Sequence, residues 1–164
     1  MPKTYEPIAT YTTTGSEYTF TFSSIPQTYT DLVLVLAGSL TSPVAMYIRL
    51  NGDSATNYSL TILEGGGASA SSSRLTSRAQ LDTSAGLSDV SSHKIFTFFN
   101  YSSTSTNKTI LSRVNAPSGS STALGATVGS WRSTAAINSI FCYNGSNQLY
   151  NAGTVVTLYG IKAA

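Results

Sequence analysis

The side chains able to carry out chemistry are few, and histidine and cysteine each occur only once. His93 follows two serines, and Cys142 lies in the apolar stretch Ile140-Phe141-Cys142-Tyr143. A metal site needs several ligands at suitable spacing, and these two residues offer no pair. A Ser-His-Asp triad would have to use His93, but no serine or aspartate is singled out as its partner. We therefore expect a structural or surface role for His93 and a buried, unreactive thiol for Cys142.

The carboxylates are the next candidates for chemistry, and the chain has seven of them: Glu6, Glu17, Asp31, Asp53, Glu64, Asp82 and Asp89. Two could converge as a glycosidase pair, but their positions in turns and at strand ends favour solvated or turn-capping roles. The segment Asn51–Asn57 lacks the spacing of a calcium loop, and Gly65–Gly67 lacks the Gly-Lys-Ser/Thr of a phosphate-binding loop. The sequence therefore predicts no catalytic residue, no metal and no cofactor, and a protein that is not an enzyme.

The composition of the chain restricts the kinds of partner that we expect. Charged residues make up only 10% of the 164 residues, and the formal net charge is +2. Such a small, scattered positive charge argues against nucleic acid as a partner. The apolar runs are too short to span a membrane, and Met1–Glu6 lacks the apolar core of a signal peptide. We expect a soluble protein made in a cytoplasm.

The pattern of residues is typical of β-structure. Tyrosine, phenylalanine, threonine and valine are frequent, and they favour strands. Apolar and polar side chains alternate in Tyr18–Phe22 and Met46–Leu50, while pairs such as Asn51-Gly52 favour tight turns. We predict an all-β fold, a single antiparallel β-sandwich over residues 1–164. The glycine- and serine-rich segment 64–73 is predicted to be a flexible loop.

One stretch departs from this alternation, because Leu32–Leu36 is apolar at every position. It follows Pro26, which lacks a backbone donor, so the strand should start only after that turn. We predict a central strand that is covered on both faces. Asp31, at its start, is expected to accept backbone hydrogen bonds.

Aromatic side chains near predicted loops offer the remaining candidates for binding. Trp131, followed by Arg132, has two interpretations: an exposed contact for a sugar or a partner, or, as we prefer, a core residue before a turn. Tyr101, Tyr143 and Tyr150 could likewise stack on sugars if they were exposed.

An ordered series of short phrases extends over nearly the whole chain. These phrases are Tyr5–Thr10, Phe22–Pro26, Tyr29–Leu32, Arg49–Asp53, Asn57–Ser59, Gly129–Ile137 and Thr157–Lys162. Together they resemble a family of small virion structural proteins of tailed bacteriophages, notably those of cyanobacteria and other aquatic bacteria. The segment Glu64–Val90 shows the least correspondence.

The resemblance implies a jelly-roll-like sandwich and a non-enzymatic place in the virion, which is assembled in the host cytoplasm. The function expected from it is a capsid decoration (cement) protein that binds between major capsid protein subunits, as a homo-oligomer. The alternative is a tail- or fibre-associated module that binds a host glycan. The expected partners are the major capsid protein or other virion proteins, with residues 1–6 as a docking arm. Candidate contact residues are Tyr5, Glu6, Trp131, Arg132 and Tyr143.

Overall fold

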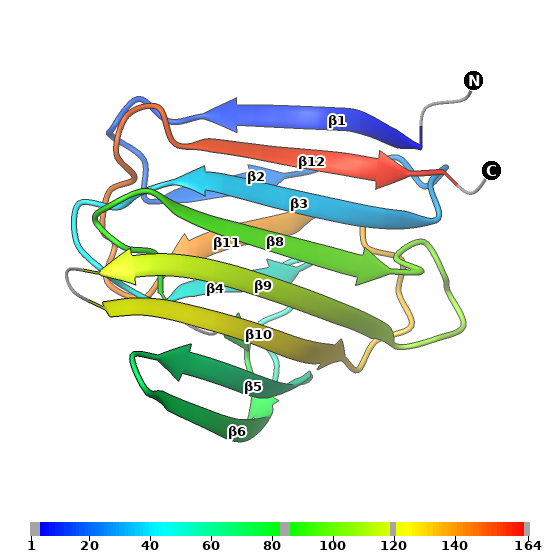
Figure 1. The fold of residues 1–164 in the computed structure, drawn as a ribbon. Coiled ribbons are helices and arrows are strands. Elements are labelled where there is room, and N and C mark those ends of the chain that lie inside the picture. The colour runs from blue at the N-terminus through cyan, green and yellow to red at the C-terminus, as the bar shows by residue number, and fades with distance from the viewer. Residues whose placement is uncertain (1–3, 83–85, 119–120, 163–164) are drawn as a thin grey trace.

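The chain forms two layers of antiparallel strands in the computed structural model, which describes residues 4–82, 86–118 and 121–162 (Figure 1). Over these residues there are twelve strands and no helix. The strands are β1 (Tyr5–Thr12), β2 (Thr19–Phe22), β3 (Asp31–Gly38), β4 (Met46–Leu50), β5 (Tyr58–Gly66), β6 (Ser69–Arg78), β7 (Leu81–Asp82), β8 (Ser92–Phe99), β9 (Lys108–Ser118), β10 (Ser121–Trp131), β11 (Ile140–Asn144) and β12 (Val155–Ile161). The predicted all-β, antiparallel sandwich is confirmed.

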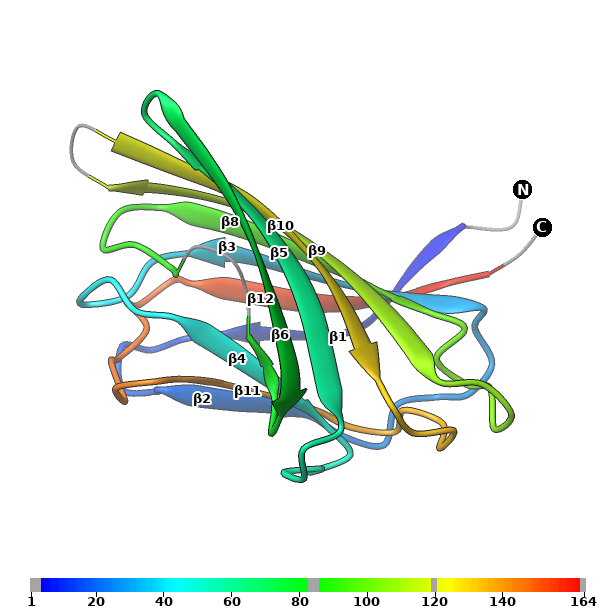
Figure 2. The same cartoon turned by 90° about the horizontal axis from the view of Figure 1, so that it is seen from below.

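The two sheets differ in width. In the described part of the chain, the larger sheet has eight strands in the order β1-β12-β3-β8-β9-β10-β5-β6, and the smaller has four in the order β2-β11-β4-β7. Figure 2 shows the four-stranded sheet lying along one face of the larger sheet. The other face of the larger sheet, which we call the outer face, has no second layer over it in the described part of the chain.

The strand pairing is nested along the chain. The first strand pairs with the last, β1 with β12, and the second with the second to last, β2 with β11. Further in, β3 pairs with β8 and β4 with β7. The four remaining strands come from two hairpins, β5–β6 and β9–β10, which add to the larger sheet next to β8. These two hairpins therefore give the larger sheet its width.

One cluster of buried side chains fills the space between the sheets. Alternate residues of each strand point into it, as the period of two requires. The larger sheet contributes Leu32, Leu34 and Leu36 from β3 with Phe96 and Phe98 from β8. The smaller sheet contributes a matching set: Phe20, Phe22, Met46, Ile48, Leu50, Ile140 and Cys142. Cys142 is fully buried, as predicted, and burial raises the pKa of its thiol.

The apolar run Leu32–Leu36 forms a central strand, as predicted, with β12 on one side and β8 on the other. Asp31 accepts the backbone N–H of Asn100 at 2.6 Å, also as predicted. The expectation that both faces are covered holds for Val33, which is 7% exposed, but no second layer lies over the outer face in the described part of the chain. Val33 and Val35 lie on the outer face, where only neighbouring side chains shield them, and Val35 is half-buried.

The predicted flexible loop 64–73 is wrong, because this segment forms the end of β5, the start of β6 and the tight turn between them. Gly66 pairs with Ser69, so that only Gly67 and Ala68 turn the chain, with Gly67 at a φ of +58°. The short serine and alanine side chains allow an extended strand whose hydrogen bonds come from the backbone.

The prediction that residues 1–6 form a docking arm is wrong for Tyr5 and Glu6. Residues 1–3 lie outside the described part of the chain. Tyr5 and Glu6 belong to β1 and pair with Ile161 and Gly160 of β12, so their backbone is held in the sheet.

Candidate functional site

The outer face of the eight-stranded sheet carries several exposed apolar side chains and has no second layer over it in the described part of the chain. Across its middle, one row runs in register through Val33, Thr97, Leu111, Val128 and Thr61. Hydrogen bonds between Thr10 and Thr157 and from Arg74 to Thr61 join side chains that lie on this same face. On these five strands the row carries an apolar or threonine side chain, which is unusual for a face in contact with water, and Arg74 of β6 follows Thr61 in register.

Three apolar side chains on the β5 and β10 part of this face are more than half exposed. Leu63 is 55% exposed, Leu124 is 56% exposed and Val128 is 52% exposed. Leu63 lies opposite Ala126, while Leu124 and Val128 occupy the same side of β10 on either side of that alanine. Neighbouring exposed apolar residues on one surface are typical of an interaction site.

A shallow hollow of about 250 Å³ lies on the same face over β8 and β9. It is lined by His93, Ile95, Arg113, Val114 and Asn115. His93 pairs with Asn115 and Ile95 pairs with Arg113, so the polar groups come from adjacent positions of two neighbouring strands. His93 is exposed, in agreement with its predicted surface role.

A second, more compact cluster of aromatic side chains lies on the four-stranded sheet, on the face that points away from the larger sheet. Tyr47 and Tyr143 pair across β4 and β11 with ring centroids 5.4 Å apart, and Phe141 stacks on Tyr143 at 5.1 Å. The guanidinium of Arg49 lies 4.9 Å from the centre of the Tyr143 ring. Because Phe141 and Arg49 both pack against Tyr143, this ring is largely engaged within the protein.

The third feature is the side chain of Asp53, which connects the turn after β4 to the end of β10. The indole nitrogen of Trp131 donates to Asp53 Oδ2 at 2.6 Å, and the side-chain amide of Asn57 donates to the same oxygen at 2.9 Å. Asp53 Oδ1 accepts the backbone N–H of Ala55 at 2.8 Å. Although burial alone would raise the pKa of Asp53, these hydrogen bonds together lower it. The aspartate therefore holds a turn and is fully engaged in doing so.

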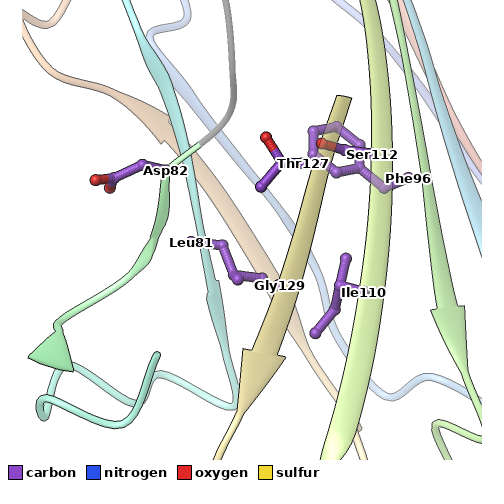
Figure 3. A pocket seen from close by; sticks show the side chains of 7 residues that line it. All are labelled: Leu81, Asp82, Phe96, Ile110, Ser112, Thr127 and Gly129. Carbon is purple, nitrogen blue, oxygen red and sulfur yellow. The ribbon is translucent and has the colours of Figure 1, made fainter. Parts of the chain in front are cut away.

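A pocket between the sheets holds only about 10 Å³, the space of a single water molecule (Figure 3). Leu81 of β7 reaches toward Gly129 of β10, where a β-carbon would come within 2.6 Å of its Cδ2. Ser112 and Thr127 place hydroxyl groups at the other end. The pocket is too small for an organic substrate, and its lining belongs to the core.

Lys94 is a buried basic group on the inner face of the larger sheet, only 1% exposed. Burial disfavours its charged form and lowers its pKa to about 7, which the negative charge of Glu64 partly opposes. Lys94 sits beside Leu36 and Val114 in register, facing the smaller sheet. It therefore affects the pH dependence of folding.

The predicted contact residues lie at separate places. Tyr5 is 57% exposed on β1, where its ring meets Tyr159 edge-on. Glu6 accepts the hydroxyl of Tyr29 and forms an ion pair of 3.0 Å with Lys162. The guanidinium of Arg132 donates to the Ser59 hydroxyl and to the backbone carbonyl of Thr56.

Trp131 is 2% exposed and stacks on Tyr58, so the core interpretation is confirmed and it is no surface contact. Tyr143 belongs to the small-sheet cluster described above. Arg113, Leu124 and Val128 were not singled out from the sequence. Their signal lies in the alternation of β9 and β10, where apolar and basic residues occupy the side that faces away from the core.

Within the described ranges, no group of three or more His, Cys, Asp or Glu side chains is placed to hold a metal ion. The same ranges contain no helix long and apolar enough to cross a membrane.

Comparison with known proteins identifies no family for this chain. No protein-family model and no curated protein matches the chain. Among solved structures there is a remote similarity to a two-domain structure of Extended-Synaptotagmin 2, at 9% sequence identity and a TM-score of 0.18. The similarity covers 83% of this chain and spans 42% of that one. So low a TM-score supports no conclusion about fold or function.

Proposed function

We propose that this chain is a non-enzymatic structural protein of a bacteriophage virion, a decoration (cement) protein that binds between major capsid protein subunits and stabilises the head. The resemblance described above motivates the proposal. Under this proposal the protein belongs to the virion, which is assembled in the host cytoplasm, and acts as a homo-oligomer with the major capsid protein or another virion protein as its partner.

The nested strand pairing supports this proposal. A jelly roll is a long hairpin of eight strands wrapped into two sheets, so that the first strand pairs with the last and each inner pair follows in turn. The pairs β1·β12, β2·β11, β3·β8 and β4·β7 match this order, with β5–β6 and β9–β10 as insertions. Jelly rolls occur in viral capsid proteins and in lectins, and the fold alone does not choose between these functions.

The observation that carries the proposal is the uncovered apolar face of the larger sheet. A strand such as β3, apolar on both sides, is typical of a sheet with layers on both faces. Here the described chain supplies one of the two layers, and Leu63, Leu124 and Val128 stand exposed. A second layer supplied by another virion protein would satisfy this pattern. In a shell with many copies, a modest free energy for each contact is enough to stabilise the particle.

The glycan-binding alternative has less support. Tyr101, Trp131 and Tyr150 are buried, and the ring of Tyr143 is packed against Phe141 and Arg49. Stacking on a sugar requires an open ring face. The aromatic residues that motivated this alternative are therefore poorly placed for it.

The test is to separate heads from tails of purified particles with a mild denaturant and to find the chain by mass spectrometry. We expect it in the head fraction, in many copies. Its presence only in the tail fraction would contradict the proposal.

A further inference from the structure

Arg113 stands near the middle of the outer face. It belongs to β9, where Ile95 of β8 and Ala126 of β10 flank it in register. Its side chain is exposed. The ion pairs Arg78–Asp82 and Lys162–Glu6 do not involve it. A guanidinium among apolar neighbours presents a positive charge with five donors in a planar fork, a geometry that matches a carboxylate.

The hollow beside Arg113 can accommodate a side chain that carries such a carboxylate. Its volume of about 250 Å³ is enough for a side chain of a partner protein. Ile95 provides an apolar wall, and His93 and Asn115 add polar groups at one end. A partner side chain could therefore place its carboxylate against Arg113 and its methylene groups against Ile95.

The charged side chains of the outer face indicate which of two occupants would bind there: a second copy of this chain, or a different protein with an acidic surface. Within the described strands of this face, the arginines are Arg113 and Arg74, and the acidic residue is Asp31, at the start of β3. Asp31 is already bound to the backbone of Asn100. A second copy docked face to face would bring arginines toward arginines, which is unfavourable. An acidic partner surface would complement them.

The size of the face fits a stable interface. Eight strands about 4.8 Å apart, each roughly 27 Å long, cover an area of roughly 1,000 Å². Standard protein interfaces bury about 800 Å² on each partner. The exposed Leu63, Leu124 and Val128 would form the apolar part of this area, next to the hollow.

We infer that the outer face of the eight-stranded sheet docks onto a protein surface that presents a carboxylate side chain among apolar ones, and that Arg113 binds this carboxylate. The inference rests on the proposed function, since the partner would be the major capsid protein. It adds the face that docks and the chemistry of the partner surface.

The experiment uses particles stripped of the chain and the purified full chain added back. Bound chain is measured by co-sedimentation over a range of concentrations. The variants are Arg113→Gln, Arg113→Lys and Val128→Asp, and thermal melting confirms that each is folded. The matched control is Arg49→Gln, which removes the same charge from the outer face of the other sheet.

We expect Arg113→Gln to weaken binding about 30-fold or more, because the partner's carboxylate would stay buried without its cation. Arg113→Lys should retain part of the affinity, Val128→Asp should lose binding, and Arg49→Gln should bind as the wild type does. Added salt should weaken the wild type more than Arg113→Gln.

Two failures can be told apart. If the wild type binds and Arg113→Gln binds equally well, this inference is wrong while the proposed function stands. If the wild type binds no particles, the proposed function itself is wrong. If analytical ultracentrifugation shows a dimer that Val128→Asp abolishes, the face is a contact between copies and the acidic partner is wrong.

Discussion

Trp131 and Asp53, 78 positions apart in the chain, are joined by a hydrogen bond of 2.6 Å from the indole nitrogen to Oδ2. It connects the end of β10 to the turn after β4. Replacing Trp131 by Phe keeps a ring in the core but leaves the carboxylate without this donor. We expect Trp131→Phe to lower the free energy of unfolding by about 2–4 kcal/mol, from the lost charged hydrogen bond and the space left behind.

This loss is measured by urea denaturation. The control is Tyr18→Phe, which removes a hydroxyl from a ring that is 47% exposed and should change little. A double-mutant cycle with Asp53→Ala isolates the pair. A coupling free energy near zero would show that the contact does not stabilise the fold.

The same aspartate should make stability sensitive to acid. Its pKa in the folded protein lies below its ordinary value of 3.8, so its contribution is present above that value and is lost as the pH falls through the lowered one. Trp131→Phe removes one of the hydrogen bonds that lower the pKa. Between pH 5 and pH 3 the wild type should therefore lose more free energy of unfolding than the variant does. Equal losses in the two proteins would contradict this assignment.

Lys94 should make the free energy of unfolding depend on pH near neutrality. Its pKa falls from 10.5 when unfolded to about 7 when folded. Above pH 7 the unfolded chain therefore binds more protons at this site, and stability rises with pH. From pH 7 to pH 8.5 we expect the contribution of Lys94 to rise by about 1.5 kcal/mol. Cys142 also begins to ionise in the unfolded chain within this window, so the contribution of Lys94 is taken as the difference from a variant that lacks this lysine.

The control for Lys94 is Lys94→Met, which keeps the length of the side chain and removes the titrating group. Chemical denaturation of both proteins at pH 7 and pH 8.5 gives the difference. The variant should show a flatter profile. A rise of the same size in both would assign the pH dependence to another group.

Gly160 lies directly beneath the ring of Tyr29. A β-carbon at this position would come within 2.3 Å of the ring, so Gly160→Ala must displace the ring and the contact that Tyr29 makes with Glu6. We expect a loss of about 1–3 kcal/mol in the free energy of unfolding. Gly65→Ala is the matched control, since its β-carbon would meet only a backbone oxygen at 3.8 Å. A smaller loss for Gly160→Ala than for the control would contradict this packing.

Local patterns in the sequence predicted the fold class because they report directly on strand geometry. The alternation in Met46–Leu50 placed Ile48 in the core and Arg49 outside, and the Asn51-Gly52 turn has the positive φ values expected of it. The segment 64–73 was misjudged because small residues carry no periodic signal. Its first strand, β5, is specified by pairing with β10, which is distant in sequence, and its second strand, β6, pairs with β5.

The candidate site was harder to predict because it depends on which face of the sheet the chain leaves uncovered. The run Leu32–Leu36 correctly indicated an apolar environment on both sides of the strand, but not that one side lies on an open face. Arg113 acquires its position only when β8, β9 and β10 align in register. Trp131 and Asp53 belong to separate phrases, and only the fold brings them into contact.

The central claim is that the outer face of the larger sheet docks this chain onto the head of the particle. Cryo-electron microscopy of intact particles tests it directly. We predict that the chain lies on the head, with Leu63, Leu124 and Val128 buried against the major capsid protein and a carboxylate beside Arg113. A map that shows the chain only on the tail, or on the head with this face open to solvent, would contradict the account.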